Sequence, residues 1–164
     1  MPYFQKEKQV ILEYYSALDS VDENDLETVI LAYINKNYIW RAFYPFEIQK
    51  NAKTIADIFW RPLRHSIRFM QRRTDIFFAG QNFIDEGDSV WVCSMGHLMG
   101  LFDHAWLDIQ PNKKIAMLRY AEFHKIENEK ISETAFYFDI PHLMMQAGYQ
   151  PFKEQAAAHL IQPG

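Results

Sequence analysis

Residues 119–148 read RYAEFHKIENEKISETAFYFDIPHLMMQAG, and this stretch decides the fold that we expect. Two runs rich in aromatic and aliphatic residues flank the polar residues 127–130, which is typical of two antiparallel strands joined by a tight turn. Asn tolerates a positive φ angle better than most residues, so Asn128 suits the tip of a hairpin. Pro141 and Gly148 bound the next segment and predict a short helix over residues 140–146.

The turn determines which residues of the two strands face one another. With Asn128 and Glu129 as the loop, Glu127 faces Lys130 and His124 faces Glu133. An odd-numbered loop or a β-bulge would shift the pairs. The same register predicts three further pairs, which are Glu122 with Ala135, Tyr120 with Tyr137, and Leu118 with Asp139.

Side chains alternate along a strand, so this register gives the hairpin two faces. One face is largely polar but keeps two tyrosines, as in a wet pocket wall or an amphipathic surface; it carries Leu118, Tyr120, Glu122, His124, Glu133, Ala135, Tyr137 and Asp139. The other face is mostly apolar and is expected to pack against another layer; it carries Met117, Arg119, Ala121, Phe123, Thr134, Phe136 and Phe138.

The composition is that of a globular protein. A chain of 164 residues favours one domain spanning 1–164, and 49% hydrophobic with 23% charged residues are ordinary values for a globular protein. Aromatic residues make up 16% of the chain, which suits a deep core or an aromatic-lined cavity. The net charge of -4 argues against general nucleic-acid binding.

A cluster of basic residues recurs at three- and four-residue spacing. Arg61, Arg64, Arg68 and Arg72 would share one face of a helix. A solvated helix face that continues into a strand is the ordinary interpretation. A phosphate or carboxylate site is the alternative.

Three features that the sequence lacks indicate where in the cell the protein is expected. Cys93 is the only cysteine, so no disulfide can form within the chain. The polar residues 1–8 do not resemble a signal peptide, and no apolar run is long enough to span a membrane. We therefore expect a cytoplasmic protein without a membrane partner.

Helices come first along the chain and strands follow. Helical spacing predicts helices over residues 5–18, 22–35 and 51–59, and strands are expected over 38–43, 73–80, 89–99, 114–126 and 130–138. This order indicates an α+β class with a curved, mainly antiparallel sheet and helices on one face. The long aromatic-rich connection 100–112 is of a kind that often covers a site.

Five segments in this order resemble a known family. They are Tyr14–Asp19 as a first helix, Tyr38–Trp40 as a first strand, Phe59–Leu63 as a third helix and its exit, Phe123–Ile131 with Glu133 and Asp139, and finally Leu143 with Gln146. On these segments the chain resembles the SnoaL-like polyketide cyclases, within the nuclear transport factor 2-like superfamily.

The resemblance implies a conical α+β barrel with a deep pocket and a homodimer formed through the sheet. It also implies intramolecular aldol condensation without a metal or organic cofactor. Asp139 matches the family's acid/base residue, and His124 matches an assisting histidine. The chain carries Glu133-Thr134-Ala135 where the family often has Glu-His-Trp.

Asp139 is open to two interpretations, as an acid/base residue and as a helix N-cap. A carboxylate at the end of a core strand can be desolvated and can act as an acid or base. An aspartate directly before Ile140-Pro141 is also a favoured helix N-cap. One residue can do both.

His124 opposite Glu133 suits an imidazole oriented by a carboxylate, or an ordinary cross-strand pair. His97 and His104 lack the spacing of a metal site, so no metal is expected. The residues expected to line the pocket are Tyr14, Trp40, Phe43, Trp60, His97, His104, Trp106, Tyr120 and Tyr137. Core packing also explains the aromatic ones.

The leading hypothesis is a cofactor-independent enzyme that acts on a small, mostly apolar oxygenated molecule. Asp139 would be its acid/base residue, supported by His124 and Glu133. The alternatives are a non-catalytic protein that binds a small hydrophobic ligand, and a dimerising scaffold whose pocket is filled by side chains.

Overall fold

The computed structural model describes residues 3–84, 87 and 89–151. In chain order its elements are α1 (Gln5–Ser20), η1 (Glu23–Asp25), α2 (Leu26–Tyr33), β1 (Ile34–Ala42), β2 (Ile48–Gln49), α3 (Ala52–Ile55), η2 (Ala56–Trp60), α4 (Arg61–Ser66), β3 (Ile67–Gln81), β4 (Val90–Phe102), β5 (Ile115–Glu127), β6 (Lys130–Phe138) and α5 (Ile140–Gln146). None of the helices in these ranges is long and apolar enough to cross a membrane.

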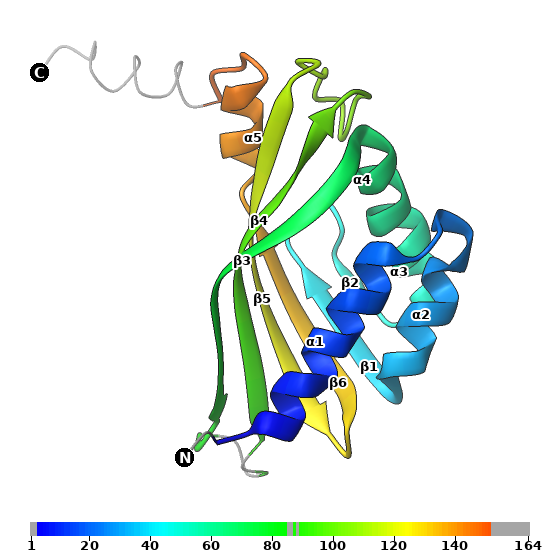
Figure 1. Cartoon of the computed structure of the whole chain (residues 1–164), viewed down its shortest axis with the longest axis vertical. Coiled ribbons are helices and arrows are strands. Elements are labelled where there is room, and N and C mark those ends of the chain that lie inside the picture. Colours follow the sequence, from blue (N-terminus) through cyan, green and yellow to red (C-terminus); the bar gives the residue numbers. More distant parts are fainter. Residues whose placement is uncertain (1–2, 85–86, 88, 152–164) are drawn as a thin grey trace, which may run out of the picture.

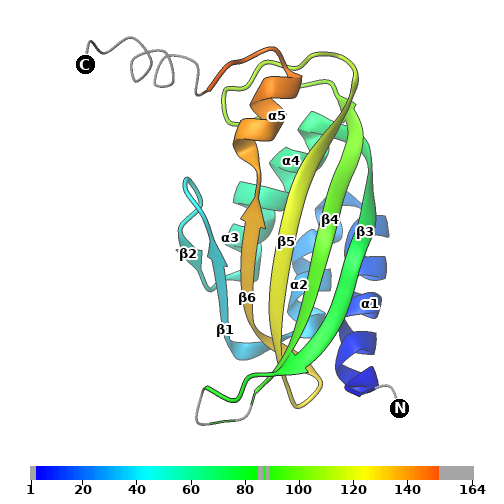
Figure 2. The ribbon, with the colours of Figure 1, turned by 90° about the vertical axis from the view of Figure 1, so that its left-hand side faces the viewer.

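The strands form one curved, mixed sheet. Its order is β2-β1-β6-β5-β4-β3, and β1 runs parallel to β6 while the other neighbours are antiparallel. Helices α1 to α4 cover the concave face, and α5 lies at one end of the sheet (Figures 1 and 2). The expected α+β class is confirmed, with a sheet that stays open because β2 and β3 form its two edges.

The core lies between α1 to α4 and the concave face. Helix α1 buries residues at the spacing of one helical face, namely Ile11, Tyr14, Tyr15 and Leu18. Aromatic rings from β1, η2 and β6 meet in the centre, where the Trp40 and Phe136 ring centroids lie 5.6 and 5.0 Å from that of Phe59. This inner face therefore combines an aromatic core with the side chains of α1.

The helix expected over residues 51–59 is part of a longer helical run. Asn51 caps it by accepting hydrogen bonds from the backbone of Lys53 and Thr54, and the run continues through the π-helical turn η2 into α4. Pro62 does not end the run, because it lies in the first turn of α4, where proline is tolerated. The arginine cluster is consequently divided between helix α4 and strand β3, as expected, but it is not solvated throughout, because the Arg72 side chain is only 4% exposed.

The predicted turn of the hairpin is confirmed. Asn128 and Glu129 have φ angles of 50° and 62°, and Glu127 pairs with Lys130. Positive φ at both loop residues is the geometry that joins two twisted antiparallel strands most directly.

The predicted pairs beyond the turn are wrong by one residue, because of a β-bulge. Ile126 pairs with Ile131, but Lys125 pairs with Glu133, so β6 contributes the extra residue Ser132. His124 consequently faces Thr134 instead of Glu133. The remaining observed pairs are Phe123 with Ala135, Glu122 with Phe136, Ala121 with Tyr137 and Tyr120 with Phe138.

The bulge exchanges the two faces of β6. Thr134 and Phe136 are buried beside the inward side chains of β5, whereas Glu133 and Tyr137 lie on the outer face. With Glu122 and His124 facing inward, as observed, the predicted register would have placed Phe136 and Phe138 on the outer face and Glu133 in the core. Burial of Phe136 favours the bulged arrangement, because a fully buried aromatic ring contributes roughly 1.5–3 kcal/mol, and Phe138 packs against the same core.

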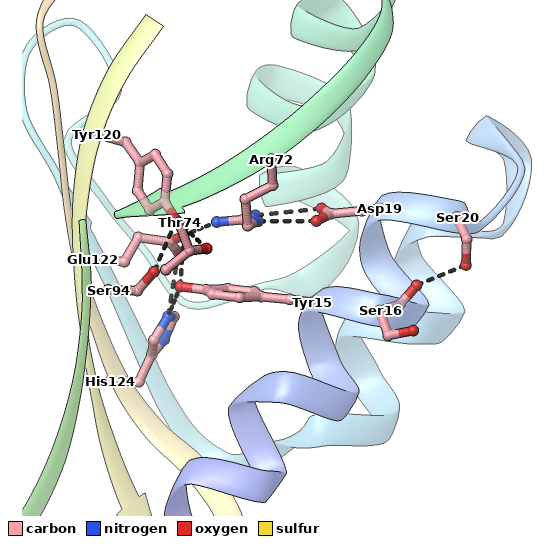
Figure 3. A network of polar contacts seen from close by, with 10 residues as sticks. All are labelled: Tyr15, Ser16, Asp19, Ser20, Arg72, Thr74, Ser94, Tyr120, Glu122 and His124. Atoms are coloured by element: carbon pink, nitrogen blue, oxygen red, sulfur yellow. Dashed lines mark hydrogen bonds and ion pairs between the residues drawn. The ribbon is translucent and has the colours of Figure 1, made fainter. Parts of the chain in front are cut away.

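The backbone of strand β3 lies very close to that of β4 at two glycines of β4. A Cβ atom on Gly96 would collide with the carbonyl oxygen of Arg73, and one on Gly100 with that of Arg68. Register shifts on either side of the segment 71–74 accompany this close approach. The bent strand brings Arg72 over the concave face toward α1 (Figure 3).

Candidate functional site

A group of polar side chains lies inside the concave face. Its members come from α1, β3, β4, β5 and β6, and they are Tyr15, Asp19, Arg72, Thr74, Ser94, Tyr120, Glu122, His124 and Thr134 (Figure 3 shows all but Thr134). Glu122 is 2% exposed and His124 is fully buried. Carboxylates and imidazoles are rarely buried this deeply without a structural or functional reason. We refer to this group as the interior polar cluster.

The Tyr15 hydroxyl joins the two titratable residues of β5. It lies 3.0 Å from Oε1 of Glu122 and 2.9 Å from Nε2 of His124. The other ring nitrogen of His124, Nδ1, lies 2.9 Å from Oγ1 of Thr134. Glu122 and His124 are two residues apart, so they share a face of β5, and the helical spacing of α1 places Tyr15 opposite them.

Arg72 connects this group to helix α1. Its Nη1 donates to Oε1 of Glu122 at 2.9 Å, while Nε and Nη2 donate to the two oxygens of Asp19 at 2.9 and 3.3 Å. The guanidinium also stacks 3.6 Å from the centroid of the Tyr15 ring. Arg72 therefore pairs with two carboxylates and packs as a flat, weakly hydrated cation against an aromatic ring.

Burial controls the protonation of these residues. It raises the pKa of Glu122, although Arg72 and the Tyr15 hydroxyl act in the opposite direction. Burial, together with the charge of Arg72, lowers the pKa of His124 to about 3. It also raises the pKa of Tyr15 well above its ordinary value. At neutral pH His124 is therefore a neutral imidazole and Tyr15 keeps its proton.

These states give the hydrogen bonds a consistent direction. If Thr134 donates to Nδ1 of His124, then Nε2–H donates to the Tyr15 oxygen, and Tyr15 O–H donates to Glu122. The result is a continuous chain of donors that ends on a carboxylate. Such a chain can move a proton to or from Glu122 without a metal or an organic cofactor.

Tyr120 anchors the opposite side of the interior polar cluster. Its hydroxyl lies 2.8 Å from Oγ of Ser94 and 3.4 Å from Oγ1 of Thr74. Its ring lies 5.0 Å from the guanidinium carbon of Arg72. Tyr15 and Tyr120 thus enclose the guanidinium between two aromatic side chains.

Several proteins of known structure have a similar fold. A protein provisionally named a SnoaL-like polyketide cyclase from Jannaschia sp. superposes with a TM-score of 0.67 at 13% identity, over 92% of this chain and 97% of that one. An NTF2-like protein from Burkholderia thailandensis gives 0.61 at 20% identity, over 87% and 97%. The chain has the nuclear transport factor 2-like fold.

The similarity to these structures concerns the fold alone, because sequence identities of 13% and 20% do not indicate a shared function. No protein-family model matches the chain, and no curated protein gives a significant match. A protein provisionally named a hydroxylase from Streptomyces galilaeus shares the fold with a TM-score of 0.63 at 13% identity, over 94% of this chain and 91% of that one. One fold thus carries differently named proteins, and function must be argued from the site.

The nuclear transport factor 2-like fold does not bring the three predicted catalytic residues together. His124 lies at the centre of the interior polar cluster. Glu133 lies on the outer face and pairs with Arg41 at 2.6 Å, so its predicted pairing with His124 is wrong. Asp139 accepts a hydrogen bond from the backbone of His142 at 2.9 Å, which makes it the N-cap of α5. A catalytic role for Asp139 stays a prediction.

The residues predicted to line a pocket separate into two groups. Five are buried in the fold, namely Tyr14, Trp40, Trp60, Trp106 and Tyr120. The other four reach the surface. Phe43 and Tyr137 are 58% and 41% exposed, His97 pairs with Asp75 at 3.1 Å, and His104 stacks on His65.

The predicted set omitted most of the interior polar cluster. Glu122 stood on the correct face of the predicted hairpin but received no role, and Arg72 was placed with the basic cluster. Sequence reasoning could not single out Tyr15, because the adjacent Tyr14 is an equal candidate and both side chains are buried on α1. Thr134, which departs from the family's usual histidine, here holds the ring of His124.

Several clefts reach the surface around this core. One of about 490 Å³ is lined by Asp19 and by residues of α4 and β3. Another, of about 440 Å³, lies beside Phe43, Arg119, Tyr137 and Asp139. Among the described residues no three His, Cys, Asp or Glu side chains are grouped to hold a metal ion. Both clefts border the interior polar cluster, the first at Asp19 and the second at Tyr120.

Proposed function

We propose that the protein catalyses cofactor-independent acid/base chemistry at the interior polar cluster. The observation that carries the proposal is the contact of one hydroxyl, Tyr15, with both a buried carboxylate and a buried imidazole. The reaction class is intramolecular aldol-type cyclisation or a related isomerisation. The substrate would be a small, mostly apolar oxygenated molecule, as in the polyketide cyclases whose fold this chain shares.

The chemistry needs a base and an acid within reach of one another. Glu122 would take a proton from a carbon next to a carbonyl group, since burial makes its carboxylate a stronger base. The resulting carbanion would attack a second carbonyl carbon, and Tyr15 O–H would protonate the new alkoxide. The proton on Glu122 then returns to Tyr15, so the enzyme ends each cycle unchanged.

Arg72 would stabilise the negative charge at the site, which Glu122 carries before the reaction. Its contact with Glu122 favours the ionised carboxylate before the reaction, and its contact with Asp19 fixes the guanidinium. The aromatic rings of Trp60 and Tyr120 beside Arg72 suit an apolar substrate.

The test measures exchange of carbon-bound hydrogen for deuterium in D₂O, followed by NMR. An apolar β-keto ester serves as the probe, because its acidic C–H requires only a base. We expect wild type to accelerate exchange and Glu122→Gln to lose roughly 10²–10⁴-fold of that rate. Glu127→Gln is the matched control, because it changes an exposed carboxylate of the same strand. Equal rates for wild type and Glu122→Gln would contradict the proposal.

The second candidate is a protein that binds a small hydrophobic ligand without turnover. The closed packing of the site argues against turnover there, because Glu122 and His124 are at most 2% exposed and Arg72 fills the space beside Tyr15. The same experiment separates the two candidates. Saturable binding of the β-keto ester without exchange would support the binding protein.

We also propose that the chain forms a homodimer through the outer face of the sheet, the side shown in Figure 2. Ile76 and Phe78 are 49% and 46% exposed there, and Phe78, Trp91, Phe123 and Tyr137 line a shallow apolar cleft of about 430 Å³. Contiguous apolar surface of this kind marks an interaction site. Sedimentation equilibrium is expected to show a dimer for wild type and a monomer for Phe78→Lys. A monomeric wild type would contradict this assembly.

A further inference from the structure

A second polar site lies at the surface, where α1, α4 and β3 meet. It is a cleft of about 490 Å³ lined by Asp19, Glu23, Arg64, His65, Ile67, Arg68, Phe69, Met70 and His104. Two arginines and two histidines therefore face one hollow. Arg64 and Arg68 belong to the basic cluster seen in the sequence, and the proposed acid/base chemistry uses neither.

Arg64 is the most informative residue of this cleft. Its Nη1 atom is buried, and it has no hydrogen-bond partner within the described part of the chain. A guanidinium carries five N–H donors that match a carboxylate or phosphate group in a two-pronged contact. Leaving a donor of this kind buried and unpartnered costs folding free energy. Nη1 itself is closed off from the cleft, so a ligand would contact the part of the Arg64 side chain that lines it.

The neighbouring donors face the same hollow. Arg68 uses Nη1 to contact Asp103 at 3.1 Å, but Asp103 is shared with Lys113 at 3.2 Å. The two cations contact different oxygens of one carboxylate, and Arg68 keeps further N–H groups for a ligand. The rings of His65 and His104 stack with their centroids 4.2 Å apart and form one polar wall.

Two carboxylates, those of Asp19 and Glu23, also line the cleft. Both oxygens of Asp19 accept hydrogen bonds from Arg72 inside the molecule, so they are already engaged away from Arg64. Glu23 is exposed, and its backbone carbonyl accepts hydrogen bonds from Arg61. Neither carboxylate partners Nη1 of Arg64.

We propose that this cleft binds an oxyanion, a carboxylate or phosphate group, with Arg64 as its principal ligand and Arg68, His65 and His104 around it. The proposal goes beyond the acid/base function and does not depend on it, because none of these four residues belongs to the interior polar cluster. The two proposals can therefore fail separately.

The test is a titration of the protein at fixed pH and ionic strength, followed by NMR of the histidine ring protons. Inorganic phosphate and acetate are the two probes, and chloride is the reference. We expect saturable shifts of the His65 and His104 signals, with those of His97 and His142 unchanged. Tighter binding of phosphate would assign a phosphate-bearing ligand, and tighter binding of acetate a carboxylate-bearing one.

Variants identify the ligand residue. Arg64→Gln is expected to weaken binding about tenfold or more, the effect of losing a charge-assisted hydrogen bond. Arg73→Gln makes the same substitution at an exposed arginine of β3 outside the cleft, and it should bind within about twofold of wild type. If Arg64→Gln does not fold, Arg68→Gln at an exposed position replaces it, with a loss of about fivefold expected.

Three results would overturn the proposal. One is a response to phosphate and acetate no larger than that to chloride. Another is equal movement of all histidine signals, which would indicate general screening. The third is unchanged affinity in the arginine variants of the cleft, since the anion would then bind elsewhere.

Discussion

Nη1 of Arg72 lies 2.9 Å from Oε1 of Glu122, so an edge strand and a central strand of the sheet share a buried ion pair. The side chains of the two residues are 4% and 2% exposed. Such a pair is costly to bury, and breaking it costs more, because one charge is then left without a partner. The pair also ties the base of the proposed reaction to Asp19 on α1.

Replacing Arg72 by methionine is therefore expected to destabilise the protein strongly. The expected loss is roughly 3–5 kcal/mol of unfolding free energy, because Glu122 keeps a buried charge and Asp19 loses its partner. Urea denaturation measures it. Arg73→Gln on the other face of the same strand should change stability by no more than about 0.5 kcal/mol. A loss below about 1 kcal/mol in Arg72→Met would show that the pair does not hold the core.

A double variant separates charge from packing at the same place. In Arg72→Met combined with Glu122→Gln, neither member of the pair remains charged. We expect this double variant to be more stable than Arg72→Met alone, because the uncompensated carboxylate is gone. An additive loss in the two variants would contradict a direct interaction between the residues.

The buried imidazole predicts a dependence of stability on pH. Burial and Arg72 lower the pKa of His124 from 6.5 to about 3, so between these values the unfolded chain binds more protons than the folded one. Stability therefore falls as the pH is lowered through this window. The raised pKa of Glu122 has the opposite sign, since its contribution is lost as the pH rises.

His124→Gln isolates the histidine contribution. Glu122 is present in both proteins, so its effect largely cancels when the variant is compared with wild type. The advantage of wild type in unfolding free energy is expected to shrink as the pH falls from 6.5 toward 3, by up to about 5 kcal/mol. Urea denaturation at several pH values measures this. Parallel pH curves for the two proteins would show that His124 titrates alike in both states.

The bulge at Ser132 makes a prediction about neighbouring residues of β6. Phe136 is fully buried, whereas Tyr137 is 41% exposed on the outer face. Phe136→Ala is expected to cost about 3–5 kcal/mol, because it leaves a cavity among core aromatic rings. Tyr137→Ala should cost much less in urea denaturation and should weaken the proposed dimer instead. The reverse order of the two effects would indicate the unbulged register.

Asp139 offers a direct test of its structural role. Its carboxylate accepts a hydrogen bond from His142 N at the start of α5, so Asp139→Ala should cost about 1 kcal/mol. For a domain of this size the melting temperature should fall by roughly 2–4 °C. Asp139→Asn should keep most of the stability, since asparagine also caps helices. An unchanged or raised melting temperature in Asp139→Ala would indicate a carboxylate held at a cost to folding.

The hairpin shows how far sequence reasoning reaches into the site. Asn128 fixed the turn, because a positive φ angle is a property of one residue and its neighbours. The bulge carried no comparable local signal, since Ser132 is compatible with either register. The predicted polar face was therefore correct for β5, where Glu122 and His124 lie, and wrong for β6, where Thr134 replaces Glu133.

The sequence by itself determined the class of the fold, the turn of the hairpin and the cap of α5. These depend on periodicity and on residues close together in the chain, so local preferences and the burial of apolar faces suffice to specify them. Only the tertiary structure decided which polar residues meet. Tyr15 and His124 are 109 positions apart and Arg72 and Glu122 are 50. The first contact follows from the packing of α1 on the sheet, and the second from the bend of β3. Such contacts result from the packing of the whole core, which no local pattern encodes.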